Sequence, residues 1–249
     1  MIQFNRPITT IMVVLAVYLA GNRLVAQNTY SIDVSQVKTE LKRGHLDLGG
    51  KNQYGDSIGV NSFYIERNGK PIIPVIGEFH YCRYPNAYWD EELKKMKAGG
   101  ISVVATYVFW NLHEFKEGEF NWDNVLNLQQ FVELCKKKQL DVIVRIGPFA
   151  HGEMRNGGLP DWLYGRPIEV RSNDPAYLFY TQRLYQQIGK QLTGLLFNDG
   201  GPVIGIQLEN EYQHSAAPWA FTYTDAPKEL AQAKGSGRKF STPDGAHHW

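Results

Sequence analysis

Four short apolar segments alternate with three amphipathic segments between residues 74 and 208, and this pattern constrains the fold more than any other feature of the chain. The apolar segments lack the every-second-residue polarity of half-exposed strands, which is typical of strands covered on both faces. The pattern therefore predicts β/α units around a parallel sheet. The expected strands are 74–79, 101–107, 141–146 and 203–208, and the expected helices are 86–98, 125–138 and 176–196.

Doubly wound sheets and (β/α)8 barrels share this alternation, and the polar residues favour the barrel. No G-x-G-x-x-G follows a first strand, which argues against a dinucleotide-binding sheet. Polar and aromatic side chains instead follow each predicted strand, where barrel enzymes carry their chemistry. They are His80-Tyr81, Trp110-Asn111 with His113-Glu114, Glu153, and Asn210-Glu211. A closed barrel needs eight strands, so we expect about the first half of a (β/α)8 TIM barrel.

The first 26 residues have the pattern of a cleaved signal peptide. Arg6 precedes an apolar run over 11–20, and Ala26 provides a small residue before a mature start near Gln27. The run is shorter than the roughly 20 apolar residues of a membrane span. We therefore expect export to the periplasm or extracellular space, with no membrane attachment after cleavage.

The remaining boundaries follow from composition and turn chemistry. Residues 27–60 are expected to form an N-terminal extension and 61–249 a partial barrel domain, with a polar segment from about residue 222. The dipeptide Asn68-Gly69, between 62–67 and 71–79, predicts a type I′ hairpin turn.

Charge and cysteine content exclude several functions. A net charge of +1 provides no field that would attract nucleic acid or an anionic membrane. Cys82 and Cys135 are too few for a disulfide framework and have no metal-ligand spacing, and their pairing stays open. No cofactor motif is present, and the oligomeric state is not indicated.

The stretch 200–212 (GGPVIGIQLENEY) carries the strongest chemical signal. Glycosidic bonds are usually cleaved by two carboxylates, of which one protonates the leaving oxygen. An expected strand that ends in Asn-Glu, after Gly-Gly-Pro and before Tyr, resembles glycoside hydrolase family 35, the β-galactosidases. The resemblance implies that Glu211 is the general acid/base and that Asn210 hydrogen-bonds the sugar 2-hydroxyl. We expect a carboxylic acid of this kind to face a partly dry cleft, which raises its pKa.

Three further segments match the same family in order along the chain, so that the resemblance spans 72–212. It implies that Tyr107 lines the sugar pocket and that Glu153, beside the Gly152 backbone, binds galactose hydroxyls. The segments are 77–85 (GEFHYCRYP), 106–114 (TYVFWNLHE) and 145–163, which contains Arg-Ile-Gly-Pro-Phe, Gly-Glu and Gly-Gly-Leu-Pro-Asp-Trp-Leu. The family commonly has alanine at 152, an aromatic residue at 154 and cysteine at 151, where this chain has Gly152, Met154 and His151.

The resemblance implies a retaining exo-glycosidase that removes terminal non-reducing β-galactose from oligosaccharides or polysaccharides. The family's nucleophile is a glutamate on the seventh strand, and we expect that strand to be absent from this chain. Two alternatives remain open. The chain could be an inactive fragment or weak carbohydrate binder, or the enzyme could prefer another sugar, such as a β-glucosaminide.

Other side chains allow plainer interpretations. His80 and His113 could be core histidines, and Trp110 and Trp162 could serve packing or sugar stacking. A zinc site is not supported by H-E-x-x-H or by any tight ligand pair, so no metal is expected. The side chains that would form such a site are His80, His113, His151 and Glu153.

Overall fold

The computed structural model describes residues 31, 40–44 and 48–212. The predicted signal peptide and the polar segment after residue 222 lie outside these residues. Contacts divide the chain into Met1–Glu40 and Leu41–Trp249, and every element named below belongs to the second unit. Among the described helices, none combines the length and the apolar character that a membrane crossing requires.

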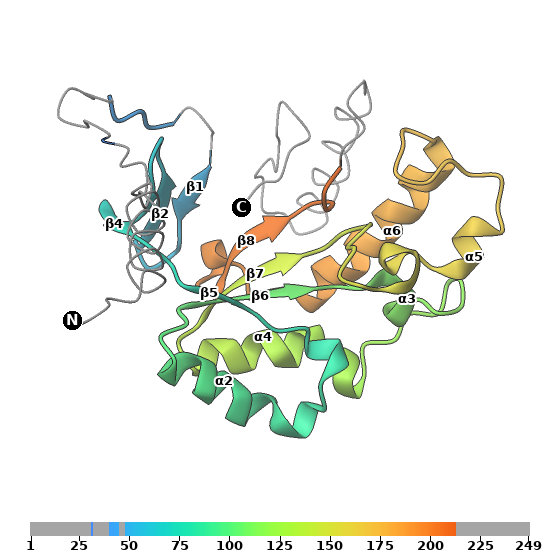
Figure 1. Cartoon of the computed structure of the whole chain (residues 1–249), viewed down its shortest axis with the longest axis horizontal. Coiled ribbons are helices and arrows are strands. Elements are labelled where there is room, and N and C mark those ends of the chain that lie inside the picture. Colours follow the sequence, from blue (N-terminus) through green and yellow to red (C-terminus); the bar gives the residue numbers. More distant parts are fainter. Residues whose placement is uncertain (1–30, 32–39, 45–47, 213–249) are drawn as a thin grey trace, which may run out of the picture. The chain divides into compact units, whose positions relative to one another are not determined.

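A four-stranded parallel sheet lies at the centre of this unit (Figure 1). Its strands are β5 (Ile76–Glu78), β6 (Val103–Tyr107), β7 (Asp141–Arg145) and β8 (Val203–Gln207). The spatial order β5-β6-β7-β8 equals the chain order, and each neighbouring pair is parallel. Consecutive strands that pair in chain order, with a helix between them, are the repeating unit of a (β/α)8 barrel. The predicted fold is confirmed as a partial barrel.

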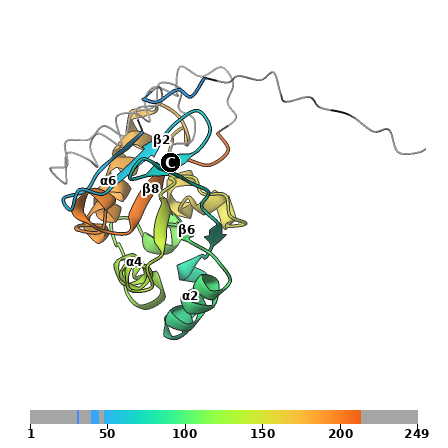
Figure 2. The same ribbon diagram turned by 90° about the vertical axis from the view of Figure 1, so that its left-hand side faces the viewer.

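Three helices cover the same face of this sheet (Figure 2). They are α2 (Trp89–Ala98), α4 (Leu128–Lys137) and α6 (Pro175–Gln191). Val104, Val142 and Val144 point toward these helices and share one buried cluster with them. The helix residues that are fully buried in this cluster include Trp89, Leu93, Phe131, Leu184 and Ile188. Burial of each large apolar side chain stabilises the fold by roughly 1.5–3 kcal/mol, so this face holds the principal core.

The helix boundaries follow from local chemistry that the sequence predicts. α2 ends at Gly99, and α6 begins with Pro175 at its first position. The Asp174 carboxylate accepts hydrogen bonds from the amides of Ala176 (2.8 Å) and Tyr177 (3.4 Å). Such a cap satisfies amides that have no partner within the helix.

The opposite face of the sheet carries a smaller apolar cluster of Val103, Ala105 and Ile143, against which Ile204 packs. Successive side chains of a strand alternate between faces. Tyr107 and Arg145 follow Ala105 and Ile143 by two residues, so they lie on this inner face at the carboxyl ends of β6 and β7. The inner face therefore changes from apolar to polar toward those ends.

A second, antiparallel sheet consists of β1 (Gly49–Lys51), β2 (Ser57–Val60), β3 (Ile65–Arg67) and β4 (Lys70–Ile72), in that order. Asn68 (φ 52°) and Gly69 (φ 73°) join β3 to β4, and the positive φ of both confirms the predicted type I′ turn. β1 and β2, which lie in the expected extension, carry no apolar pattern that predicts them.

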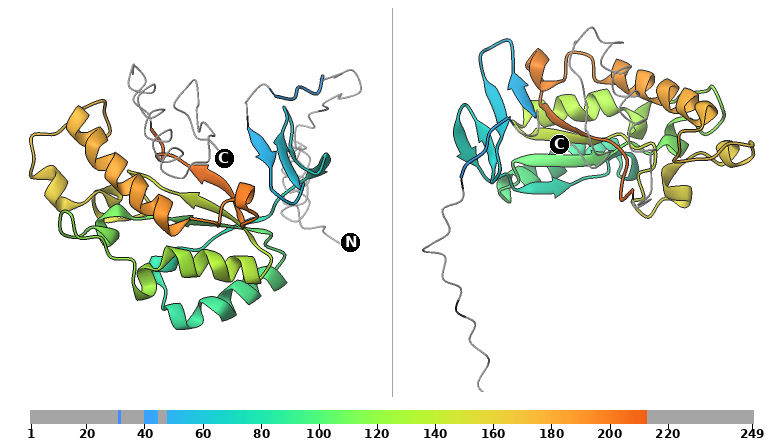
Figure 3. Two further views of the ribbon diagram at one scale, coloured as in Figure 1. Left: turned by 180° about the vertical axis from the view of Figure 1, so that it is seen from behind. Right: turned by 90° about the horizontal axis from the view of Figure 1, so that it is seen from above.

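The antiparallel sheet is tied to the amino ends of the barrel strands (Figure 3). Arg67 forms a 2.9 Å ion pair with Asp141, the first residue of β7. The Gln53 side chain donates a 2.8 Å hydrogen bond to the carbonyl of Asp199, shortly before β8. The carboxyl ends of the strands stay free for other side chains.

The loops after β6 and β7 contain short helices that the sequence did not predict, α3 (Trp110–His113) and α5 (Asp161–Tyr164). The Trp110 indole donates to the Glu114 carboxylate at 2.7 Å, and the Trp162 indole donates to the Glu114 carbonyl at 2.9 Å. The two indole rings meet edge to face at 5.9 Å. Both tryptophans therefore have packing roles. Single-turn elements of the 3-10 type are η1 (Tyr81–Arg83), η2 (Asn86–Tyr88), η3 (Asn124–Leu126), η4 (Arg155–Gly158) and η5 (Phe197–Asp199).

Candidate active site

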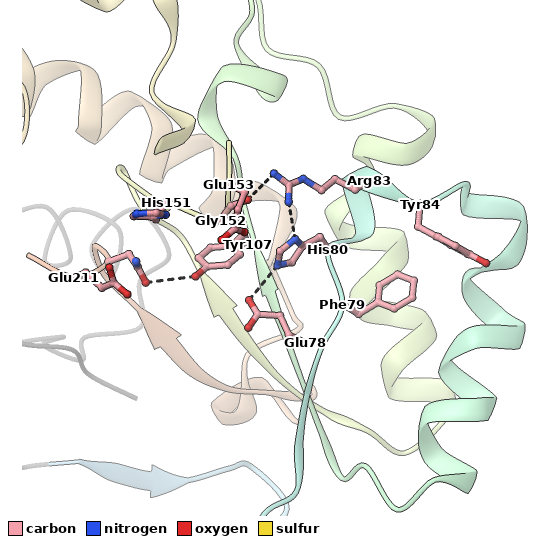
Figure 4. Close-up of a pocket in the computed structure, with 11 residues that line it drawn as sticks. Glu78, Phe79, His80, Arg83, Tyr84, Tyr107, His151, Gly152, Glu153 and Glu211 are labelled. Carbon is pink, nitrogen blue, oxygen red and sulfur yellow. Dashed lines mark hydrogen bonds and ion pairs between the residues drawn. The ribbon is translucent and has the colours of Figure 1, made fainter. Parts of the chain in front are cut away.

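A cleft of about 650 Å³ opens at the carboxyl ends of the parallel strands (Figure 4). This volume lies in the range of small-ligand sites. The structure brings all five residues that sequence analysis singled out into this one cleft: Tyr107, Gly152, Glu153, Asn210 and Glu211. The other lining residues are Glu78, Phe79, His80, Arg83, Tyr84 and His151.

Strand geometry explains why residues far apart in sequence meet here. Tyr107 is the last residue of β6, and Asn210 and Glu211 follow β8 by a few residues. Gly152 and Glu153 belong to the loop after β7. The carboxyl ends of parallel strands lie at one edge of the sheet, so residues that follow different strands face a shared space.

The amide of Asn210 is held in one orientation by three donors. Its Oδ1 atom accepts hydrogen bonds from Arg145 Nη2 (2.6 Å), Gln207 Nε2 (3.3 Å) and the Tyr107 hydroxyl (3.4 Å). Among the described residues, the Asn210 Nδ2 atom donates to no protein group. An amide fixed in this way presents two N–H donors to a ligand in the cleft.

Tyr107 is positioned by the same arginine. The Arg145 guanidinium lies 3.8 Å from the centre of the Tyr107 ring, in a cation–π arrangement. Burial raises the pKa of Tyr107, and the Arg145 charge opposes this effect only in part. The phenol therefore stays protonated at neutral pH and serves as a donor.

A chain of polar contacts runs along the floor of the cleft. Arg145 Nη1 donates to Glu78 at 2.8 Å, and His80 Nε2 lies 3.1 Å from the same carboxylate oxygen. Burial raises the pKa of Glu78, but the His80 hydrogen bond and the Arg145 charge outweigh burial and leave the pKa below its usual value. Glu78 is therefore an anion committed to its neighbours.

Arg83 connects this chain to the loop after β7. Its Nη2 atom donates to the Gly152 carbonyl at 2.6 Å, and its Nη1 atom lies 3.2 Å from His80 Nδ1. The guanidinium also stacks 4.6 Å from the centre of the Phe109 ring. His80 is thus part of the cleft wall rather than of the core.

The loop that carries Glu153 has an unusual backbone. His151 (φ 58°), Gly152 (φ 54°) and Glu153 (φ 49°) are three consecutive residues in the left-handed region. A Cβ atom on Gly152 would lie 2.8 Å from Phe109 Cζ, which explains why this position has no alanine side chain. Backbone strain of this kind persists only where surrounding contacts impose it, and it is concentrated at functional sites.

Two glutamates follow β8, and their environments differ. Glu211 lines the cleft and is exposed, whereas Glu209 is 4% exposed and lies outside the cleft lining. The exposure of Glu211 differs from the partly dry position expected from sequence. Glu211 follows β8, which is the edge strand of the described parallel sheet.

Glu209 forms a contact that sequence analysis missed. Arg171 donates to both of its carboxylate oxygens, at 3.3 and 2.7 Å. The two residues are 38 positions apart, in a long irregular loop and in a turn, so no periodicity connects them. The sequence motif that contains Glu211 also contains Glu209, but nothing in the sequence indicates that Arg171 is its partner.

Of the four side chains in the zinc interpretation, His80, His151 and Glu153 line the cleft, and His113 lies apart from them. His113 is fully buried, with its Nε2 atom 2.7 Å from the Tyr81 hydroxyl and its Nδ1 atom 2.9 Å from the Asn121 carbonyl. Within the described ranges, no three His, Cys, Asp or Glu residues are grouped as metal ligands. His113 is a core histidine.

A partial (β/α)8 barrel with an Asn-Glu pair after its fourth strand and a polar cleft at the strand ends defines the class of barrel glycosidases. A solved GH5_18 protein from Streptomyces cattleya, in complex with Manb1-4GlcNAc, shares the fold with a TM-score of 0.50 at 15% identity, over 66% of this chain and 42% of that one. The sequence model of glycosyl hydrolases family 35 matches residues 63–245. The chain belongs to this family.

Curated relatives carry β-galactosidase names. The chain is 40% identical to a β-galactosidase of Xanthomonas manihotis over 66% of this chain and 28% of that protein. It is 38% identical to the β-galactosidase of Bos taurus over 59% and 22%, and 35% identical to β-galactosidase-1-like protein 3 of Mus musculus over 70% and 26%. The chain thus spans about a quarter of the length of these relatives.

Proposed function

We propose that this chain provides the acid/base half of a retaining β-galactosidase site. The observation that carries the proposal is the convergence of Glu211, Asn210, Tyr107 and Glu153 on one cleft. Membership of family 35 and the names of the relatives support galactose as the sugar. The proposed substrate is a terminal non-reducing β-galactose of an oligosaccharide or polysaccharide.

In the proposed reaction, Glu211 donates its proton to the glycosidic oxygen as the C–O bond breaks, and a second carboxylate bonds to the anomeric carbon. Glu211 then removes a proton from water, whose oxygen replaces the second carboxylate. Asn210 donates a hydrogen bond to the 2-hydroxyl, and Glu153 accepts hydrogen bonds from other hydroxyls. The family resemblance implies that the second carboxylate is a glutamate on a seventh strand.

The test of this role is Glu211→Gln in the complete protein that contains the chain. Loss of a general acid removes about 10²–10⁴-fold of rate when the leaving group is poor. We therefore expect kcat/KM to collapse on an alkyl galactoside and to change little on dinitrophenyl galactoside, whose leaving group needs no proton. Unchanged activity on both substrates would eliminate Glu211 as the acid.

The sugar itself needs a separate measurement. His151, Gly152 and Met154 differ from the residues usual in the family, and His151 and Gly152 line the cleft. A panel of aryl glycosides with β-galactose, β-glucose and β-N-acetylglucosamine compares kcat/KM directly. We expect preference for galactose, and preference for the glucosaminide would reassign the substrate.

A second candidate is that the 249-residue polypeptide by itself binds sugar without turnover. Within the described residues, the carboxylates that line the cleft are Glu78, Glu153 and Glu211, and Glu78 is committed to Arg145 and His80. In the proposed site Glu211 is the acid/base and Glu153 binds sugar hydroxyls, so no described carboxylate is assigned as the nucleophile. Nitrophenol release from a nitrophenyl galactoside by this polypeptide would argue against this candidate, and ligand-dependent NMR shifts without release would support it.

We further propose that the protein is exported. The support is the sequence alone: a basic residue, an apolar run over 11–20 and a small residue at position 26. Amino-terminal sequencing of the protein recovered outside the cytoplasm tests this proposal. A start near Gln27 is expected, and retention of Met1 in a cytoplasmic product would contradict it.

A further inference from the structure

An ion pair lies beside the cleft, between Arg171 in the loop after β7 and Glu209 in the turn after β8. Both partners are largely buried, with side chains 18% and 4% exposed. The arginine fork engages both carboxylate oxygens, and its guanidinium stacks 3.7 Å from the centre of the Phe149 ring. A planar, bidentate and stacked arginine fixes its partner in position as well as in charge.

The same two side chains also hold the main chain that carries the acid. Arg171 Nη2 donates to the Asn210 carbonyl at 3.0 Å, and the Glu209 carboxylate accepts from the Asn210 amide at 3.0 Å. The Glu209 amide donates to the Gly147 carbonyl at 2.8 Å, and the Tyr212 hydroxyl donates to the Arg171 carbonyl at 3.1 Å. The peptide units on either side of Asn210 are thus tied to the loop after β7.

This turn needs external support because of its backbone conformation. Glu209 (φ 56°) and Glu211 (φ 47°) both lie in the left-handed region, which costs about 1–2 kcal/mol for a residue with a side chain. Gly147 and Gln207 hold the Glu209 peptide independently of the ion pair, whereas the contacts of the Asn210 main chain with a different loop run through the pair. Without them, the Asn210–Glu211 segment would relax toward conformations that point the carboxyl group elsewhere.

Neither partner touches the space where a sugar would bind, since Arg171 and Glu209 are absent from the cleft lining. Glu209 is also unsuited to be the acid itself, because its two oxygens accept from the Arg171 fork and from the Asn210 amide. Its effect on a reaction must pass through the residues that follow it.

We infer that the Arg171–Glu209 pair positions the general acid/base Glu211 by clamping the main chain on both sides of Asn210. This inference rests on the proposed function of Glu211. It makes Arg171 and Glu209 positioning residues, and it predicts a defect in proton donation rather than in sugar binding. Misplacement of a catalytic group by about 1 Å can cost 10²-fold in rate.

The experiment compares Glu209→Gln with Glu114→Gln in the complete protein. Glu114 is a matched control, since it is fully buried, pairs with Arg183 and lies outside the cleft lining. For each variant, kcat/KM is measured on an alkyl galactoside and on dinitrophenyl galactoside. The ratio of the two values is independent of the fraction of protein that is folded.

For Glu209→Gln we expect kcat/KM to fall about 10–100-fold on the alkyl galactoside and less than about threefold on the dinitrophenyl galactoside. Glu114→Gln should lower the melting temperature and leave the substrate ratio unchanged. Arg171→Lys keeps the charge but loses the fork, and a smaller change of the ratio in the same direction is expected. This variant also serves if Glu209→Gln yields too little folded protein.

The outcomes separate this inference from the proposed function. If Glu211→Gln changes the substrate ratio and neither Glu209→Gln nor Arg171→Lys does, the pair is purely structural and the inference is wrong. If Glu211→Gln itself leaves the ratio unchanged, the proposed acid is wrong. An equal change of the ratio in Glu114→Gln would also overturn the inference, because any buried charge loss would then produce it.

Discussion

The orientation of the Asn210 amide is fixed by protein hydrogen bonds in the absence of a ligand. Its oxygen accepts from Arg145, Gln207 and Tyr107, so its nitrogen is left to face the cleft. The family resemblance of the Asn210-Glu211 motif predicts that the Asn210 amide faces the cleft. The three donors come from the ends of different strands, and only the fold reveals which of them converge on one atom.

A substitution tests this orientation. Asn210→Asp keeps an oxygen for Arg145 but removes the N–H donor, so the proposed hydrogen bond to the 2-hydroxyl is lost in the transition state. We expect kcat/KM on an aryl galactoside to fall about 10–100-fold, and on the 2-deoxy analogue to fall much less. The two substrates are measured side by side. An equal loss on both would show that Asn210 does not contact the 2-hydroxyl.

Gly152 provides a second residue-level prediction. Alanine at this position combines a left-handed backbone with a Cβ atom 2.8 Å from Phe109 Cζ. Gly118→Ala is the matched control, since its φ is 84° and nothing lies within 4 Å of its Cβ position. We expect both variants to lose about 1–2 kcal/mol of unfolding free energy from backbone strain.

Only Gly152→Ala should lose more than this and also raise KM, because Phe109 and Tyr107 must shift. Denaturant unfolding and steady-state kinetics of the complete protein measure the two effects. Equal stability and equal KM in the two variants would contradict the packing argument.

At the level of elements, periodicity predicts those whose own side chains form the core. The four barrel strands and the helices α2, α4 and α6 appear where apolar spacing indicates them. The short helices α3 and α5 were missed because distant contacts stabilise them, such as the Trp162 indole with the Glu114 carbonyl. β1 and β2 were missed because strands of three and four residues carry too little pattern.

The helix α3 carries a group that links stability to pH. Burial lowers the pKa of His113 from 6.5 to about 4, which its hydrogen bond to the Asn121 carbonyl only partly opposes. Between these values the unfolded chain binds a proton and the folded chain does not. The stability conferred by neutral His113 is therefore complete above pH 6.5 and is lost as pH falls toward 4, by about 3 kcal/mol.

We expect His113→Gln to flatten the fall in unfolding free energy between pH 6.5 and pH 4. Urea unfolding at several pH values measures this slope. His151→Gln removes an exposed imidazole and serves as the control for the loss of a histidine. A parent slope that persists in His113→Gln would assign the acid sensitivity to other groups.

At the level of the whole molecule, both cysteines report on the integrity of the core. Cys82 and Cys135 are free and buried, which settles the pairing that sequence left open. Burial raises the pKa of each thiol to about 12. The thiolate is the reactive form, so neither thiol should react readily in the folded protein.

We expect a thiol reagent at pH 8 to label neither cysteine in native protein and both in denaturant. Absorbance of the released chromophore counts the labelled thiols over time. Because the two thiols belong to different elements, η1 and α4, simultaneous exposure along a denaturant series would indicate one cooperative unit. Rapid labelling without denaturant would mean that the barrel half opens locally around these residues.

The three left-handed residues at 151–153 restrict how this site can be varied. Asparagine, aspartate, histidine and glycine tolerate that backbone, whereas valine, isoleucine and threonine do not. In a mutant library intended to change sugar specificity, most of the twenty residues at positions 151–153 would strain this backbone. Wider variation therefore belongs at cleft positions with ordinary torsion angles, such as Tyr84 (φ −134°, ψ 137°).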